Sequence, residues 1–358
     1  MRNKMSVQMP TYLSAKFGAF DVLSFEGYEE LSQPYEFDIQ FNSAEARLDL
    51  ADLLGKPLTF GLHETVEATL LGGDLPEAVR RVWHGVVRRA SSLKHNENNH
   101  LYSITLAPKI SLLADFTTSR LFQNQSVPEI VGALLRKHGF TGSDFVFKLT
   151  REYQVFEYVT QFCENDLEFI QRLLAQEGIY FAFEQGKNSE QLIFADNLEG
   201  YVRENLKFVA FRANSGLESA AQESVHALDI AHLTMLKKTQ LKNYNYRDSN
   251  APLLVEYGFN GDTKATNGVN FQWGDSDFRT QQQGQLLAKI RQERSIAAQC
   301  YANGRGDVML TRPGEVLRLN GFSAIEAPHG WLVVKVGHKA SRQDSYVNDF
   351  EVIPGDRV

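Results

Sequence analysis

Three carboxylates crowd one short segment of this sequence and raise the question of acid–base chemistry. Glu164, Asp166 and Glu168 open the stretch ENDLEFIQRLLAQEGIYFAFEQ, which spans residues 164–185. Two carboxylates about 5–10 Å apart across a glycosidic bond are the arrangement that hydrolyses sugars. Acids at such a position also have a structural explanation, because carboxylates in the first turn of a helix stabilise the positive end of its dipole.

The spacing of the neighbouring residues favours the helix. Leu167, Ile170 and Leu174 recur at the interval that places side chains on one helical face. Gly178 suits a left-handed residue at the end of that helix. The following IYFAFE is typical of a half-buried strand, and QLIFAD at 191–196 predicts the second strand of a hairpin.

The acids themselves are poorly spaced for a catalytic pair. Asp166 and Glu168 are two residues apart, so on a helix they do not face each other. Glu164 and Glu168 are expected to share a helical face as a solvated pair. The chain holds 44 Asp and Glu residues, and no pair among them stands out. We assign no catalytic residue, and a cell-wall carbohydrate-active enzyme is kept as an alternative function.

Other motifs with known chemistry are missing from the sequence. The 9 histidines form no HExxH pair and the 2 cysteines form no CxxC pair, the spacings that would indicate a zinc or redox site. Neither a GxSxG elbow nor a P-loop occurs. Cys163 follows Phe162 and is expected to be a small buried hydrophobic residue. We therefore predict no cofactor and no metal site.

Composition and charge narrow the class of protein. The 358 residues suffice for two or three domains, and 43% hydrophobic with 23% charged residues is typical of a folded protein. The net charge of -7 disfavours nucleic acid as a partner. The N-terminus lacks a signal-peptide pattern, and no segment approaches the ~18 apolar residues of a membrane span. Any export is expected to proceed without an N-terminal signal.

The first third of the chain has the period-two alternation of β-strands. Short polar turns separate the alternating segments, which occupy residues 20–27, 35–43, 56–64, 83–93 and 100–108. The intervening LADLLG suggests one helical turn that ends at Gly55. Several short strands joined by polar turns indicate a β-barrel or a β-sandwich.

The middle of the chain changes to the helical period. Ser126, Pro128 and Glu129 carry the N-terminal signature of a helix. Residues 213–229 predict a loop or a weak helix. A long helix is expected from Phe278 to Gln299, with strand patterns on both sides of it.

Two hairpin patterns echo each other along the chain. Residues 84–108 and 330–355 each contain a glycine, a β-branched strand, a polar turn and a second strand that ends at a proline. An alternating strand precedes each, KPLTFGLHE in the first case and PGEVLRLNGF in the second. Counted from Val87 and Val334, the distances to the two prolines differ by one residue. We interpret the echo as two related β-barrels in one chain.

Taken in order, several segments resemble VgrG, the spike protein of type VI secretion, and the related baseplate hub proteins of contractile-tailed phages. The resemblance runs from about residue 20 to 354 and is carried by FEGYEELSQPYEFDIQF, LLGKPLTFGL, WHGVV, LYSITLAPKISLL, RLFQNQSVPEIVGALL, YVTQFCENDLEFIQRLLAQEGIYFAFE, LIFAD and YVNDFEVIP. Within this ordered set, ENDLEFIQRLLAQEGIYFAFE is specific, whereas any one of the other pieces alone would be a weak signal.

The resemblance implies a mixed, mainly β fold of the phage-hub kind. It gives a first β-barrel domain at 1–112, an α/β portion at 113–227 and a second β-barrel domain at 228–358 with an inserted helix near 276–299. It also implies a structural homotrimer, the hub of a contractile injection machine, which adapts a six-fold tube to a three-fold spike.

The resemblance further implies the partners of the chain. These are an Hcp-like tube protein, baseplate components, and a C-terminal spike with its tip protein. The family's spike would begin where this sequence stops, at Val358, so we expect a fragment or a stand-alone hub. The expected location is the bacterial cytoplasm, followed by export within the machine. A phage-tail baseplate hub and a plain binding module for effectors or a tail tip are the alternatives.

Two aromatic residues are candidate subunit contacts. Pro34, Tyr35, Gly85 and Gly178 match positions of the family, and turn formation and packing explain them. The alternative hypothesis places Tyr35 and Trp83 between subunits, because aromatic side chains are favoured at interfaces.

Overall fold

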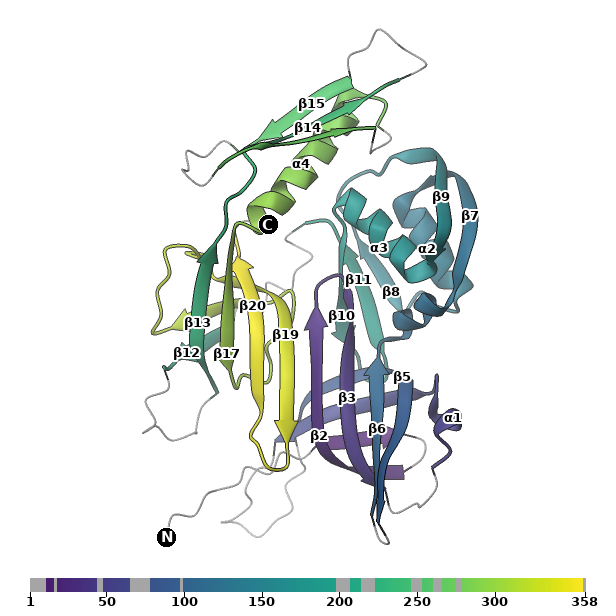
Figure 1. Cartoon of the computed structure of the whole chain (residues 1–358), viewed down its shortest axis with the longest axis vertical. Coiled ribbons are helices and arrows are strands. Elements are labelled where there is room, and N and C mark those ends of the chain that lie inside the picture. The colour runs from purple at the N-terminus through teal and green to yellow at the C-terminus, as the bar shows by residue number, and fades with distance from the viewer. Residues whose placement is uncertain are drawn as a thin grey trace.

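The computed structural model describes residues 11–15, 18–43, 48–64, 78–96, 99–197, 207–213, 223–245, 253–259, 266–274 and 278–356. Most elements in this part of the chain are strands, and a 12-stranded sheet that closes on itself twice dominates the fold (Figure 1). The prediction of a mainly β fold with two β-barrels is confirmed.

The first barrel is a closed ring of the strands that come first in the chain. They are β1 (Thr11–Ala15), β2 (Gly18–Glu30), β3 (Gln33–Ser43), β4 (Pro57–Glu64), β5 (Ala78–Asn96) and β6 (Asn99–Ala107). The hydrogen-bonded order β1-β4-β5-β6-β3-β2 closes because β1 also pairs with β2. Phe37, Ile39 and Phe41 alternate along β3 and are buried inside the ring, as their period predicted.

The second barrel is built from strands late in the chain. They are β12 (Lys207–Phe211), β13 (Ser224–His232), β17 (Cys300–Gly306), β18 (Val316–Asn320), β19 (Trp331–Ser341) and β20 (Val347–Pro354). The order β19-β18-β12-β13-β17-β20 closes because β19 also pairs with β20. Its core contains Trp331, Val333, Val336, Phe350 and Val352, all buried.

The two barrels have the same strand connectivity. If the strands of each barrel are numbered in chain order, the neighbouring pairs are first–second, second–third, third–sixth, sixth–fifth, fifth–fourth and fourth–first in both. One difference is the direction of the first strand, since β12 runs parallel to its neighbours and β1 runs antiparallel.

The echo in the sequence corresponds to the hairpins β5–β6 and β19–β20, which occupy equivalent places. A β-bulge follows Val87 in β5 and Val333 in β19, so these two residues correspond. The alignment that begins at Val334 is therefore displaced by one residue. With this correction, both hairpins reach their prolines over the same distance.

An α/β portion lies between the barrels in the sequence. It contains the 3-10 helix η1 (Lys109–Asp115), β7 (Thr117–Ser126), α2 (Val127–Lys137), β8 (Phe145–Lys148), β9 (Val155–Asn165), α3 (Asp166–Glu177), β10 (Tyr180–Gln185) and β11 (Glu190–Ala195). β7 and β9 form a two-stranded ribbon, and β10, β11 and β8 form a small sheet. The apolar faces of α2 and α3 pack between them.

The predicted end of the first helical turn, the start of α2 and the end of α3 are confirmed. The helical turn α1 (Leu50–Leu53) ends before Gly55, whose φ is 72°. Ser126 and Glu129 form a capping box at α2, and Asn165 heads a capping box at α3. Gly178 closes α3 in the left-handed region with φ 67°.

The acids at the start of α3 differ from the expectation in one respect. Glu164 is still part of the strand β9, so it does not share a helical face with Glu168. Glu164 instead forms an ion pair with Arg172, whose Nη2 lies 2.6 Å from its carboxylate. The strand continues to Asn165, which the sequence pattern did not reveal.

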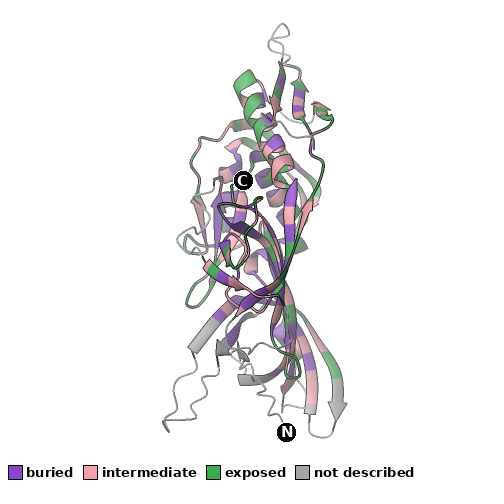
Figure 2. Ribbon diagram, turned by 90° about the vertical axis from the view of Figure 1, so that its left-hand side faces the viewer, coloured by how far each residue is buried: buried purple, intermediate pink, exposed green. Residues whose placement is uncertain are grey.

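The segment between β13 and β17 forms a small α/β layer. It contains β14 (Lys238–Asn243), β15 (Leu253–Gly258), β16 (Val269–Trp273) and α4 (Gln281–Ala297), which is the long helix expected from Phe278 to Gln299. The sheet order is β15-β14-β16. Gly284, Ala288 and Gln292, spaced four apart, are buried against this sheet, while the other side of α4 is exposed (Figure 2).

One expectation within the second barrel is wrong. Residues 213–229 were expected to form a loop or weak helix, but 224–229 belong to β13. Residues 214–222 lie outside the described residues. Because β12 and β13 are members of the second ring, we propose that the second barrel begins near residue 207, whereas the sequence suggested 228.

Candidate functional site

The two barrels are joined by a strand pairing that we term the seam. β2 of the first barrel pairs antiparallel with β19 of the second, from Glu30 opposite Lys335 to Ser24 opposite Ser341 (Figure 1). The backbone hydrogen bonds of the seam turn the facing walls of the barrels into one continuous layer. Two exposed ion pairs border it, Lys335 with Glu30 at 3.1 Å and Lys339 with Glu26 at 3.0 Å.

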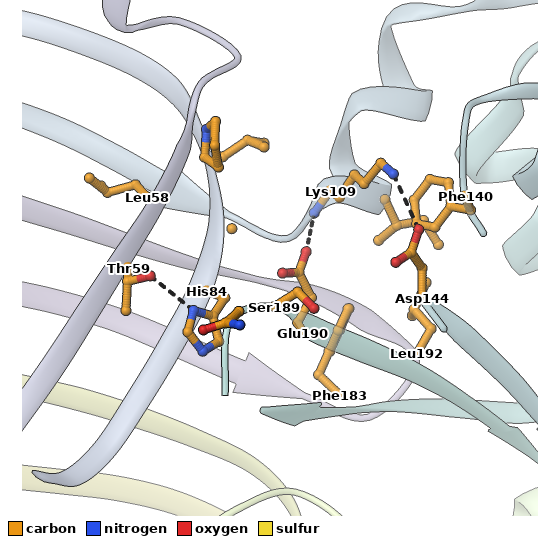
Figure 3. A pocket seen from close by; sticks show the side chains of 15 residues that line it. Leu58, Thr59, His84, Lys109, Phe140, Asp144, Phe183, Ser189, Glu190 and Leu192 are labelled. Carbon is orange, nitrogen blue, oxygen red and sulfur yellow. Dashed lines mark hydrogen bonds and ion pairs between the residues drawn. The ribbon is translucent and has the colours of Figure 1, made fainter. Parts of the chain in front are cut away.

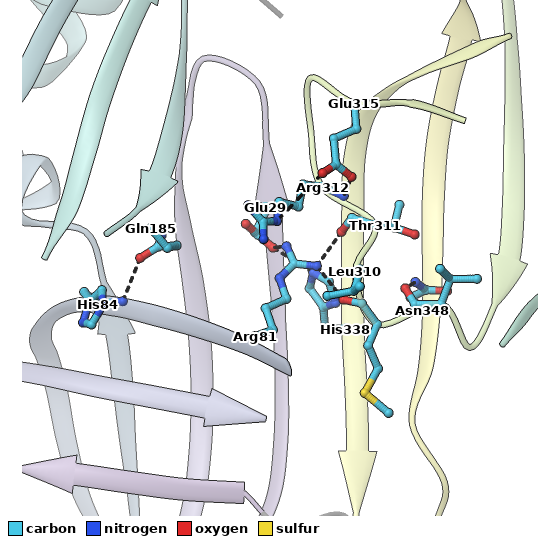
Figure 4. A network of polar contacts seen from close by, with 12 residues as sticks. Glu29, Arg81, His84, Gln185, Leu310, Thr311, Arg312, Glu315, His338 and Asn348 are labelled. Atoms are coloured by element: carbon cyan, nitrogen blue, oxygen red, sulfur yellow. Dashed lines mark hydrogen bonds and ion pairs between the residues drawn. The ribbon is translucent and has the colours of Figure 1, made fainter. Parts of the chain in front are cut away.

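A buried polar network lies inside the seam (Figure 4). The guanidinium of Arg81, from β5, forms an ion pair with Glu29 of β2. Arg81 also donates to the carbonyl oxygens of Met309 and Thr311, which precede β18 in the second barrel. His338 of β19 completes the network, with its Nε2 3.0 Å from Glu29 Oε1. All three charged or ionisable side chains are buried.

The protonation states in the network follow from burial and charge. Burial lowers the pKa of His338 to about 4, although the hydrogen bond to Glu29 opposes this effect. The neutral ring then donates from Nε2 to the carboxylate and accepts at Nδ1 from the hydroxyl of Tyr346, 2.6 Å away. Burial raises the pKa of Glu29, but the charge of Arg81 and the hydrogen bond from His338 outweigh it and leave the pKa at about 2.

The chemistry of this network is structural. The guanidinium of Arg81 and the hydrogen bond from His338 compensate the buried charge of Glu29. The residues come from both barrels, which fixes the rotation of one barrel against the other as well as their distance. Sequence reasoning missed Glu29, Arg81 and His338. A usable signal existed, because Arg81 shares the inward-facing parity of Trp83 in an alternating strand.

Tyr35 and Trp83 do not lie where a second chain could touch them. Both side chains are 0% exposed in the single chain and belong to the core of the first barrel. The Tyr35 hydroxyl donates to the backbone carbonyl of His84, and the Trp83 ring packs against Phe37 with centroids 4.5 Å apart. The hypothesis of subunit contacts is thus replaced by a packing role.

A cavity of about 540 Å³ lies between the first barrel and the α/β portion (Figure 3). His84 of β5 contacts Thr59 Oγ1 at 2.9 Å. Glu190 accepts the backbone N–H of Lys109 at 2.7 Å, and the Lys109 ammonium lies 3.4 Å from Asp144. The two carboxylates that line this cavity therefore hold η1 and the loop before β8 in place.

Asp166, one of the acids singled out in the sequence, is fully buried. Its carboxylate accepts hydrogen bonds from Gln161 at 2.7 Å, His138 at 2.7 Å and Arg120 at 3.2 Å. Burial raises the pKa of Asp166, but the hydrogen bonds from Gln161 and His138 outweigh it and hold the pKa below its usual value. Asp166 joins the ribbon β7–β9 to α2 at the start of α3.

The two cysteines differ in their exposure. Cys163 is exposed, which corrects the expectation of a buried side chain, and Cys300 is buried. Among the described residues, no group of three His, Cys, Asp or Glu side chains is arranged to hold a metal ion. Among the helices of the described ranges, none combines the length and apolar character that a membrane crossing requires.

Twin closed barrels joined edge to edge define the class of protein. The chain belongs to the phage tail baseplate hub (GPD) family, whose model matches residues 28–344.

The chain is similar to particular spike proteins of type VI secretion. It is 28% identical over 323 residues to VgrG4b of Pseudomonas aeruginosa, covering 90% of this chain and 38% of that protein. It is 29% identical over 328 residues to VgrG1a of the same organism, covering 89% of this chain and 47% of that protein. The chain thus spans less than half the length of these relatives.

Solved structures with a similar fold include a component of a type VI secretion system and a prophage tail protein. The E. coli c3393 protein, described as a component of the type VI secretion system, has a TM-score of 0.69 at 26% identity, with 97% of this chain and 78% of that chain covered. The 43 kDa tail protein of prophage MuSo2 from Shewanella oneidensis has a TM-score of 0.64 at 12% identity, with 98% and 99% covered, and shows the fold alone.

Proposed function

We propose that this chain is the structural hub at the base of a type VI secretion spike. In this role it forms a homotrimer around a central axis and adapts a six-fold tube to a three-fold spike. The observation that carries the proposal is the repeated connectivity of the two barrels, because one chain then presents two similar units. Three chains present six such units, which matches the symmetry of a six-fold tube.

The proposed partners follow from this role. They are two further copies of the chain, an Hcp-like tube protein, baseplate components, and a spike with its tip protein. The chain works in the bacterial cytoplasm until the machine fires and leaves the cell as part of it. The seam supports a mechanical role, since a buried ion pair and a continuous sheet resist rotation of the barrels during contraction.

The proposal is tested by the mass of the assembly and by its binding to the tube. Light scattering of the purified chain should give three times the monomer mass. Immobilised chain should retain purified Hcp-like tube protein, and the variant Arg81→Met, which weakens the polar network inside the seam, should retain less. A chain that stays monomeric at high concentration and does not bind the tube would contradict the proposal.

A baseplate hub of a contractile phage tail is the second candidate. The family description and the fold shared with a prophage tail protein favour it. Retention of a phage tail-tube protein in place of an Hcp-like protein would select this candidate. In both cases we propose that the chain acts without catalysis, so prolonged incubation with purified cell walls should release no sugar fragments.

A further inference from the structure

A second cavity, of about 860 Å³, lies between the α/β portion and α4, and we term it the helix groove (Figure 1). One wall consists of β9 and α3, and the other consists of the exposed side of α4 together with Tyr257 of β15. An ion pair between Arg279 and Glu157, 2.9 Å apart, joins the two walls. The helix groove is within the size range of ligand sites, ~300–1,000 Å³.

β9 is an edge strand with a free side. Among the described strands it pairs only with β7. The N–H of Asp166 donates to the carbonyl of Phe116 at 3.1 Å, so the even-numbered residues of β7 direct their backbone groups toward β9. The bulge in this ladder adds its extra residue to β9 and leaves the alternation along β7 intact. Thr160, the partner of Leu121, therefore directs its N–H and C=O groups away from β7, as does Tyr158 two residues before it.

The free side of β9 faces the helix groove. Arg172 of α3 donates to the carbonyl of Thr160 from this side, at 3.2 Å. Tyr158 and Thr160 both line the groove. Among the hydrogen bonds of the described residues, none occupies the N–H or C=O of Tyr158 or the N–H of Thr160. An unpaired strand edge is a template to which an extended segment adds as a further strand.

The opposite wall determines which side chains such a strand carries. Leu286 and Lys289 of α4 line the groove one helical turn apart, and both are exposed. Lys289 lies 3.6 Å from Glu293, an exposed pair that contributes little. Arg291 adds a second cation to this wall. The α4 wall is therefore apolar and basic.

The charges of the wall formed by β9 and α3 are paired within that wall. Glu177 lies 3.5 Å from Arg151, and Arg172 lies 2.6 Å from Glu164. The other acid that lines the groove, Glu152, precedes β9 in the chain. The cations of α4 thus give the groove its charge preference beside the free edge of β9.

We propose that the helix groove receives an extended segment of a partner protein, which adds to β9 as a strand and carries apolar and acidic side chains on its face toward α4. Alternate residues of a strand share a face, so an apolar residue packs on Leu286 and an acid two residues further on reaches Lys289. Backbone hydrogen bonds to Tyr158 and Thr160 supply the affinity, and the side chains supply the specificity. The inference does not depend on the number of copies in the assembly.

Fluorescence anisotropy with labelled peptides tests the chemistry of the segment. The probe is the octapeptide VTETVTET, which alternates valine and glutamate on one face and has threonine on the other. It should bind the whole chain saturably. VTKTVTKT exchanges both acids for lysine and should bind at least ~5-fold more weakly, because like charges then face each other. VPEPVPEP keeps the acids but lacks the N–H groups of a strand, and it should not bind measurably.

Two pairs of variants test the place of binding. Tyr158→Pro and Tyr158→Ala both lose the ring, but only the proline loses the outward N–H. Tyr158→Pro should therefore bind VTETVTET at least ~3-fold more weakly than Tyr158→Ala. Lys289→Glu should weaken binding at least ~5-fold. Arg294→Glu reverses an exposed cation of α4 that does not line the groove, and it should leave binding unchanged.

The outcomes that contradict the proposal differ from one another. Absence of saturable binding by VTETVTET, or equal binding by VTKTVTKT, would overturn the chemistry of the segment. Equal binding by Lys289→Glu and Arg294→Glu would overturn the site, and this pair decides the question if urea unfolding shows that Tyr158→Pro does not fold. If Lys289→Glu lowered the mass of the assembly in light scattering without changing peptide binding, the groove would hold another copy of the chain, and the proposal would be wrong.

Discussion

Arg81 shows how one side chain connects the halves of this molecule. It is buried, it neutralises Glu29 of its own barrel, and it donates to two carbonyls of the other barrel. Removing one partner of a buried ion pair leaves an uncompensated charge, which destabilises proteins by ~3–5 kcal/mol. Arg81→Met is therefore expected to lower the urea midpoint of unfolding strongly.

The paired substitution should be milder than the single one. Glu29→Gln together with Arg81→Met removes both charges and keeps an oxygen that accepts from His338. The double variant should therefore lose less than half of the unfolding free energy that Arg81→Met loses. As a control, Lys339→Met breaks an exposed ion pair with Glu26 and should cost less than about 1 kcal/mol. Equal losses of unfolding free energy in Arg81→Met and in the double variant would mean that the uncompensated charge of Glu29 is not what destabilises Arg81→Met.

The pH dependence of stability is a second consequence at the residue scale. The pKa of His338 is about 4 in the folded chain against 6.5 in the unfolded chain, so the unfolded state binds the extra proton in this window. Stability should fall as the pH drops from about 6.5 toward 4. Glu29, with its pKa lowered from 4.5 to about 2, adds a further loss at still lower pH.

The histidine contribution is isolated by substitution. The urea midpoint of His338→Gln should change less between pH 7 and pH 4.5 than that of the parent chain, because the variant lacks the group that titrates there. His329→Gln, which removes an exposed histidine, should retain the parent's dependence. If the urea midpoint of His338→Gln changed with pH as much as that of the parent chain, the buried neutral imidazole would not be the source of the pH dependence.

At the scale of elements, the end of α3 couples the α/β portion to α4. Gly178 has a φ of 67°, and a Cβ built there would lie 3.0 Å from Ile290 Cγ2 of α4. Gly139, after α2, has a φ of 74°, with nothing within 4 Å of such a Cβ. An Ala at Gly139 meets only the left-handed strain of ~1–2 kcal/mol.

Gly178→Ala should therefore destabilise the chain more than Gly139→Ala. The extra loss comes from the displacement of Ile290, and thermal unfolding monitored by circular dichroism measures both variants under one condition. A third variant, Gly178→Ala with Ile290→Val, removes part of the clash and should recover part of the difference. If the two single variants unfolded at the same temperature, the contact between Gly178 and α4 would not contribute measurably to thermal stability.

The elements that the sequence predicted well are those with local signals. The capping residues Ser126 and Glu129 and the alternation of Phe37, Ile39 and Phe41 act within a few neighbouring residues. β13 was missed because the ladder that stabilises it is formed with β17, which is about 70–80 residues away in sequence. Glu29, Arg81 and His338 were missed because a buried charge is stabilised only by partners that folding brings together.

At the scale of the whole molecule, the seam determines how the two barrels are held together. Lys335 of the second barrel faces Glu30 of the first and forms an ion pair with it at 3.1 Å. Lys335→Glu would place two acids opposite each other, which is destabilising in a β-ladder. Lys335→Gln removes the same cation without adding an acid, so the two variants differ in one charge.

Lys335→Glu should therefore unfold more easily than Lys335→Gln. One cross-strand charge pair contributes up to about 1 kcal/mol, so the unfolding free energies of the two variants should differ by no more than about that amount. Urea unfolding at low salt measures the difference, and 1 M salt should reduce it because exposed charges are screened there. Identical unfolding free energies at low salt would mean that the charge opposite Glu30 does not help to hold the two barrels together.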